Sequence, residues 1–208
     1  MLKLLFYSGA VFLTYLETLG FEKNSKLLMA VPILVLIGIS IKSKMEERIR
    51  NLTVAVFVLS AASMYSQSNH RTTLPLPAVL QALSNILYFY TYKSLTSSNF
   101  YKAKSSIFWI LISIFGLFAI LQDLVVAIPF LTLIIFFLFS SHILLITSSS
   151  TTRRAKSFRI FANFSGFLST FLFVFNSFHT HSYDIHRLSR FAFYLSNFLM
   201  FLANERDF

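Results

Sequence analysis

The sequence predicts an all-α protein: a polytopic membrane helix bundle of about eight transmembrane helices, forming one integral membrane domain over residues 1–208. Of the 208 residues, 56% are hydrophobic and 12% are charged, whereas a soluble domain carries about 25% charged residues. The mean hydropathy of +0.69 excludes a disordered chain. A soluble body of this size has too much surface for its volume to bury so many apolar side chains.

Eight apolar segments approach the roughly 17–25 residues that a helix needs to cross a bilayer. They are expected to be helices because a backbone in lipid must satisfy its own hydrogen bonds, and because they lack the alternation of barrel strands. The connections between them are too short to hold a further domain. The predicted spans are 4–21, 25–41, 51–67, 74–92, 105–122, 124–147, 158–178 and 188–203.

Three features qualify individual spans. The first span begins like a signal peptide, with Lys3 before an apolar run, but no clear cleavage site follows, so it is expected to be retained. Pro32 and Pro129 lie near the starts of the second and sixth spans, where independent kinks are favoured over a duplicated transporter fold. Asp123 alone separates the fifth and sixth spans, which predicts a tight hairpin.

The basic residues predict the orientation of the bundle. With eight spans, the termini and the even-numbered connections share one side of the membrane. That side carries 13 of the 18 Lys and Arg residues, so both termini are predicted to be cytoplasmic. The opposite side carries the remaining five: Lys23, Lys26, Arg71, Arg187 and Arg190. Small size and short loops suggest the bacterial inner membrane.

Several classes of function are excluded or disfavoured. The net charge of +10 is concentrated beside the spans, where anionic lipid attracts it, so no nucleic-acid partner is expected. There is no Cys, which removes disulfides and thiolate chemistry. No Gly-rich phosphate loop is present. His179, His181 and His186 lie near Asp184, but a solvated loop is favoured over zinc because the spacing fits no known signature. No metal or other cofactor is predicted.

The best polar pattern lies in the fourth span, where Gln81, Ser84, Asn85 and Tyr88 share one helix face. Such groups turn away from lipid, so they either bond neighbouring helices or line a substrate cavity. We treat these four residues as candidate substrate-binding residues. Tyr194 and Asn197 of the last span are expected to lie opposite them.

Candidate acids are scarce. No Asp or Glu falls in the middle of a predicted span, and Glu17 lies near the end of the first. His142 is the only histidine well inside a span, where an ionisable residue is a functional candidate by default; a hydrogen-bonded structural histidine is the alternative. No catalytic residue is identified, and His142 and Glu17 are the two candidates for that role.

The layout and several local patterns resemble the YhhN-like lysoplasmalogenase family of small membrane proteins. The fourth span keeps the family's Ser and Tyr as Ser84 and Tyr88, with Asn85 in place of its His. The other similar positions are Gly166, Phe171 and the run 193–197. The resemblance implies hydrolysis of the vinyl-ether bond of a lysoplasmalogen, which releases an aldehyde and a glycerophospho-base.

The sequence departs from the family where its acids stand. The regions 60–64 and 173–176 contain no carboxylate, and Lys26 is not followed by the family's Pro. Vinyl-ether hydrolysis requires a proton donor, which Ser and Asn do not supply. The first expectation is therefore that the protein binds or hydrolyses a lysolipid-like vinyl ether. The alternative is that it is no enzyme, and is either a carrier of a lipid or small molecule or an accessory membrane subunit. Membrane lipid is the expected surrounding, and the sequence does not predict an oligomeric state.

Overall fold

The computed structural model describes residues 2–21, 25–67, 74–96, 129–149, 155–180 and 182–208, and every regular element within them is helical. The predicted all-α class is confirmed. The fifth predicted span, 105–122, lies outside the described residues, so the number eight stays a prediction. The α-helices are α1 (Leu2–Glu17), α2 (Lys26–Ile41), α3 (Glu47–Ser66), α4 (Pro75–Tyr92), α7 (Pro129–Ser149), α8 (Lys156–Phe175) and α9 (Tyr183–Asp207). Two short pieces accompany them, the 3₁₀ turn η2 (Lys93–Leu95) after α4 and the π turn η4 (Asn176–Thr180) after α8.

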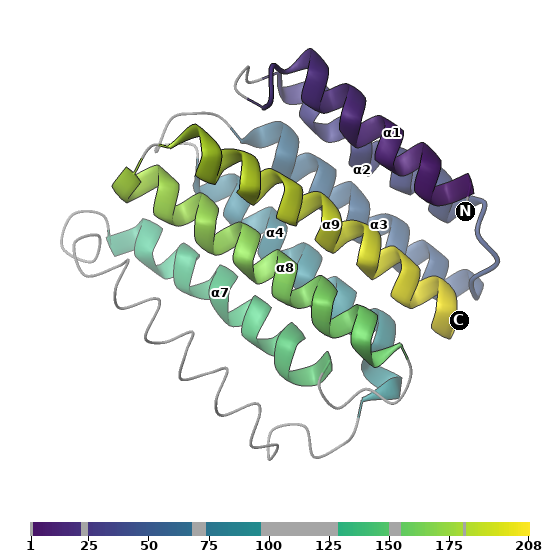
Figure 1. Cartoon of the computed structure of the whole chain (residues 1–208). Helices are drawn as coiled ribbons and strands as arrows, with labels where there is room; N and C mark the ends of the chain where they lie inside the picture. The colour runs from purple at the N-terminus through teal and green to yellow at the C-terminus, as the bar shows by residue number, and fades with distance from the viewer. Residues whose placement is uncertain (1, 22–24, 68–73, 97–128, 150–154, 181) are drawn as a thin grey trace.

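The helices lie side by side along a common direction (Figure 1). Contacts run in succession through α2, α3, α4, α7, α8 and α9, and α9 completes a ring by packing on α2 and α3. Helix α1 lies along α2, and its Tyr7 hydroxyl donates to the Tyr194 carbonyl of α9 at 2.7 Å. Both termini lie at one end of the bundle, where Lys3 pairs with Glu205.

The bounds of α1 and α9 differ from the predicted spans, and α3 begins at Glu47, four residues before its predicted span. Helix α1 ends at Glu17, four residues before the predicted limit, because Leu19, Gly20 and Phe21 adopt left-handed backbone angles (φ 52°, 72° and 68°) that turn the chain. Helix α9 runs from Tyr183 to Asp207, beyond 188–203 at both ends. Hydropathy marks the part of a helix that lipid can cover, and α9 continues into polar sequence on either side.

The described exterior is more apolar than that of a soluble protein, and many polar side chains are buried beside the apolar core. Three helices are long and apolar enough to cross a membrane, namely α3, α7 and α8 continued to Phe178, and α2 is a shorter apolar helix. More than half of the surface of many large apolar side chains is exposed, for example Leu5, Phe6, Phe12, Leu133, Phe136 and Phe161. Many Ser, Thr and Asn side chains are buried instead. An exterior this apolar suits lipid rather than water, which supports the predicted membrane class.

Helices α8 and α9 make the most extensive helix contact in the bundle, and small polar residues set their spacing. Ser169 and Ser189 donate to each other's carbonyl oxygens at 2.8 and 2.9 Å. Two turns away, the Ser196 hydroxyl donates to the Ala162 carbonyl at 2.7 Å. A Cβ on Gly166 would lie 2.9 Å from that hydroxyl oxygen and 3.4 Å from the His142 ring. The close approach of α7, α8 and α9 therefore requires glycine at this position.

We expect Gly166→Leu to destabilise the protein by about 1–3 kcal/mol, the usual cost of overpacking a close-packed interior. The matched control is Gly38→Leu on α2, because nothing lies within 4 Å of a Cβ built there. Thermal unfolding of both variants in the same detergent, followed by circular dichroism, measures the difference. Equal melting temperatures would contradict this account of the α8–α9 contact.

Candidate functional site

A pocket opens between α3, α4, α7, α8 and α9 toward the end of the bundle opposite the termini. Its walls include Gln67 directly after α3, Leu74 directly before α4, and Arg190 in the second turn of α9. The cavity holds ≈ 50 Å³, which exceeds the roughly 10–15 Å³ that one water molecule needs and leaves room for a small polar group. The pocket forms here because the ends of α3, α4 and α9 meet beside the C-terminal part of α8.

The pocket has one polar side and one apolar side. Ser63, Gln67, Gln81, Thr170 and Arg190 contribute polar atoms, and no Asp or Glu is among the described lining residues. The apolar side consists of Ile135, Leu138, Phe173, Val174 and Phe193. The buried Oε1 atom of Gln81 has no hydrogen-bond partner among the described residues, which leaves an acceptor available to a bound group.

Arg190 is the charged residue of the pocket. It is 5% exposed, and its guanidinium donates to the Gln67 Oε1 oxygen and contacts the Met64 sulfur. Its Nε lies 3.4 Å from Nε2 of His186, and the Phe173 ring centroid lies 5.7 Å away. None of these groups carries a negative charge. Within the part of the chain that the structure describes, Arg190 has no carboxylate partner.

The surroundings of Arg190 also hold few other charges. His186 lies in the first turn of α9, before the predicted span, and burial together with the Arg190 charge lowers the pKa of its imidazole to about 4. It is therefore neutral at pH 7. Asp184 is 90% exposed and pairs with Arg187 at 3.3 Å. No cluster of metal-ligating side chains forms among the described residues; His181 and the side chain of His179 lie outside them.

The polar face predicted in the fourth span points inward on α4, and its residues serve three different neighbours. Gln81 reaches the pocket and donates to Asn85 Oδ1 at 3.2 Å. Asn85 donates to Ser141 of α7 at 2.9 Å, and Ser84 bonds Ser60 of α3 at 2.9 Å. Tyr88, further along α4, contacts Arg159 instead. Only Gln81 of these four candidates lines the pocket.

The candidates in the other helices are also distributed. The Tyr194 hydroxyl donates to the Met29 carbonyl of α2 at 2.7 Å, and Asn197 donates to the Phe193 carbonyl of its own helix at 2.9 Å. His142 lies behind the pocket wall, with Nε2 2.9 Å from the Thr170 hydroxyl and Nδ1 without a partner among the described residues. Glu17 is exposed at the end of α1, and α1 contributes nothing to the pocket.

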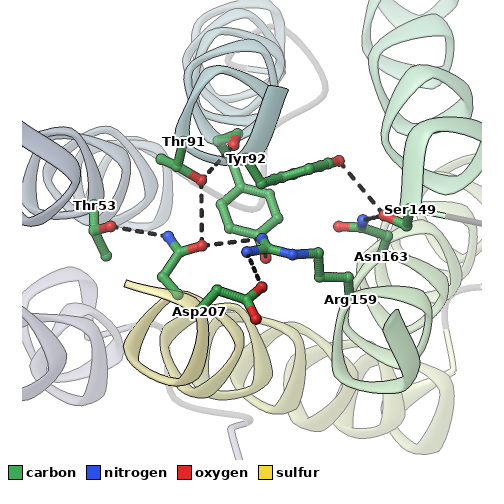
Figure 2. Close-up of polar contacts among 9 residues, drawn as sticks. Thr53, Thr91, Tyr92, Ser149, Arg159, Asn163 and Asp207 are labelled. Atoms are coloured by element: carbon green, nitrogen blue, oxygen red, sulfur yellow. Dashed lines mark hydrogen bonds and ion pairs between the residues drawn. The ribbon is translucent and has the colours of Figure 1, made fainter. Parts of the chain in front are cut away.

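A second buried charged group lies at the end of the bundle that holds the termini (Figure 2). Arg159 of α8 and Asp207 of α9 form an ion pair at 2.7 Å, with side chains 0% and 1% exposed. The same guanidinium donates to Asn204 Oδ1 at 3.0 Å and to the Tyr88 hydroxyl at 3.1 Å. It lies over the Tyr92 ring, 4.3 Å from the centroid. We refer to Arg159, Asp207, Asn204, Tyr88 and Tyr92 as the Arg159 cluster.

Hydrogen bonds from neighbouring helices extend the Arg159 cluster. Asn204 donates to Thr53 of α3 at 2.9 Å, and the Tyr92 hydroxyl bonds Ser148 of α7 at 2.8 Å. Asn163 donates to Ser149. Five helices thus converge on one buried ion pair, and each charge of the pair is matched within the chain. The cluster leaves no charge of the pair unmatched, whereas the pocket at the other end has open space.

In the sequence Arg159 stands at the edge of a predicted span and Asp207 lies beyond the last one, so their pairing was not predicted. A usable signal existed. Arg159, Asn163, Gly166 and Thr170 are spaced by four, three and four residues, so they lie on one face of α8. A polar face that includes an Arg predicts a buried partner for that Arg, because an unpaired charge inside a bundle is costly.

We expect Arg159→Met to destabilise the protein by about 3–5 kcal/mol, because it leaves the Asp207 carboxylate buried and unpaired. The double variant Arg159→Met with Asp207→Leu should recover most of the loss. Lys3→Met is the control, because the Lys3–Glu205 pair is partly exposed (43% and 26%) and such pairs contribute about 1 kcal/mol or less. Denaturation in mixed micelles measures all three, and equal losses in Arg159→Met and Lys3→Met would refute the assignment.

Comparison of this chain with protein family models, with curated proteins and with solved structures found no match. The resemblance to the YhhN-like lysoplasmalogenases therefore stays a prediction from the sequence.

Proposed function

We propose that this protein binds the polar head of a lysolipid-like amphiphile in the pocket between α3, α4, α7, α8 and α9. The observation that carries the proposal is a cavity with a polar wall at Gln81 and Arg190 and an apolar wall at Leu138 and Phe193. Ligand pockets combine apolar walls with a few polar groups that fix orientation. A head seated against the polar wall leaves an acyl chain free to follow apolar surface.

The exterior of the bundle supports a ligand that arrives from lipid. Helices α7 and α8 expose Leu133, Phe136, Phe161 and Phe164 to their surroundings. A single-chain amphiphile in the same bilayer has its head near the membrane surface, at the depth of an end of the bundle. The pocket lies toward such an end, so a head reaches it without crossing the hydrocarbon.

Binding without hydrolysis, as in a carrier, is the second candidate, and one observation favours it. Cleavage of a vinyl ether needs an acid that protonates carbon. No Asp or Glu lies among the described pocket residues, and Glu17 is exposed on a helix away from the pocket. His142, the other catalytic candidate from the sequence, bonds the pocket residue Thr170 through its Nε2. Of the two catalytic candidates that the sequence offered, only His142 is adjacent to the pocket, so hydrolysis by one of them would depend on His142.

We also propose that both termini face the cytoplasm of a bacterial inner membrane, which turns the pocket toward the outer side. The excess of Lys and Arg on the connections at the termini end supports this orientation. Within the described residues, Lys42, Lys44, Arg48 and Arg50 lie between α2 and α3 or in the first turn of α3. Arg187 and Arg190 are on the side with fewer charges.

Cysteine labelling tests the orientation, because the chain contains no Cys. Lys44 and Asp184 are both exposed and lie at opposite ends of the bundle. In intact cells, a membrane-impermeant maleimide should label Asp184→Cys and leave Lys44→Cys unlabelled. After permeabilisation both should react. The reverse pattern in intact cells would place the termini outside.

Binding and turnover of a vinyl-ether lysolipid by the purified protein test the function. We expect Ala78→Phe, which fills the pocket from α4, to weaken binding about tenfold or more, a loss of about 1.4 kcal/mol. Leu83→Phe on the same helix is the control, since Leu83 is 44% exposed and does not line the pocket. Equal affinities of the two variants would move the binding site elsewhere.

Aldehyde release in the same samples separates the two candidates. Hydrolysis predicts turnover that is above a heat-inactivated control and lost in His142→Ala. Binding without any aldehyde would support the carrier and end the hydrolase version.

A further inference from the structure

We infer that Arg190 makes the pocket selective for a net anionic head, a carboxylate or a phosphate monoester, over a zwitterionic head of the same chain length. The inference rests on the proposed function, since it concerns the ligand of the same pocket. It adds that the ligand supplies the negative charge that the described residues around Arg190 lack.

The guanidinium of Arg190 has only neutral partners among the described residues. Arg190 is buried, and its described partners are an amide oxygen, a thioether sulfur, a neutral imidazole and an aromatic ring. Burying a charge is unfavourable unless an opposite charge accompanies it. A guanidinium binds carboxylate and phosphate oxygens especially well because its N–H groups match their geometry.

The two buried arginines of the bundle, Arg159 and Arg190, differ in their partners. Arg159 is equally buried, and this fold provides it with Asp207 at 2.7 Å. Arg190 receives only neutral partners among the described residues, and of these two arginines it is the one that lines a cavity. A cavity beside an uncompensated cation is where an anion from outside the chain gains most.

The described pocket residues include no carboxylate that could bind a cationic part of a ligand. The charged groups of the described residues at this end are Asp184, Arg187, Glu17 and Lys26. Asp184 is paired with Arg187 and exposed, and neither Glu17 nor Lys26 lines the pocket. The described charges of α3 lie at the far end of that helix, and Arg159 and Lys156 are at the far end of α8. The quaternary or primary amine of a zwitterionic head would thus find no described carboxylate in the pocket.

The test measures binding of three single-chain amphiphiles with the same acyl chain to the full-length protein in nanodiscs. The probes are a fatty acid, a lysophosphatidic acid and a lysophosphatidylcholine. Inorganic phosphate is a fourth, chain-free probe, read as a shift in melting temperature. We expect the anionic probes to bind about tenfold or more tighter than the zwitterionic one, in line with a charge-assisted hydrogen bond. The ratio of fatty acid to lysophosphatidic acid affinity identifies which of the two anionic heads is preferred.

Variants at two arginines of α9 assign the effect. Arg190→Gln should lose about tenfold in affinity for the anionic probes and change the zwitterionic one by less than about twofold. Arg190→Lys retains the charge and should keep part of the preference. Arg187→Gln removes a cation from the same end of α9 outside the pocket and should leave the preference intact. Arg190→Gln should fold, because it removes a buried charge without stranding a described carboxylate.

The outcomes separate this inference from the proposed function. If all three amphiphiles bind equally, or Arg190→Gln leaves the preference unchanged, the charge selection is wrong and amphiphile binding stands. If phosphate stabilises the wild type and not Arg190→Gln while no amphiphile binds, the anion site stands and the lysolipid function falls. If no probe binds, both are overturned.

Discussion

The organising constraint of this bundle is that its exterior is apolar, so the polar atoms of its helices must satisfy one another inside. Ser169 and Ser189 donate to each other's carbonyl oxygens between α8 and α9. The hydroxyls of Ser60 and Ser84 form one hydrogen bond between α3 and α4. In an apolar surrounding an unsatisfied polar group is costly, so such bonds specify which helix faces meet. The close contact of α8 and α9 at Gly166 follows from the same requirement, because small residues let the bonded backbones approach.

The apolar exterior is also what made part of the fold predictable from the sequence. Composition and segment length predicted helices, and each described helix overlaps one predicted span. The inward direction of Ser84, Asn85 and Tyr88 also followed, since a one-sided polar face has only one favourable environment in lipid. Helix ends were less predictable. Hydropathy ended the last span at 203, whereas α9 continues to Asp207 because that carboxylate is neutralised inside the bundle by a residue from another helix.

The grouping of the polar residues could not be predicted from single helices. Arg159 and Asp207 are 48 residues apart in sequence, and both lie in stretches that a span count assigns to the membrane edge. Arg190 was counted among the basic residues on one side of the membrane, yet its side chain turns inward to Gln67. The face of α4 was visible in the sequence, but whether Gln81 meets a pocket and Tyr88 an arginine depends on the positions of α8 and α9 around it.

The two buried arginines show what sets the ends of the bundle apart. A buried ion pair contributes little net stability relative to well-packed apolar residues, while an unpaired buried charge is strongly unfavourable. Arg159 with Asp207 is the tolerable arrangement: both charges are matched, and helices α3, α4 and α7 add hydrogen bonds. Arg190 is the unfavourable arrangement as far as the described residues go, because its partners among them are all neutral. Residues that lower stability in this way are characteristic of functional sites, which is why we propose the cavity beside Arg190 as the place where an anionic ligand binds.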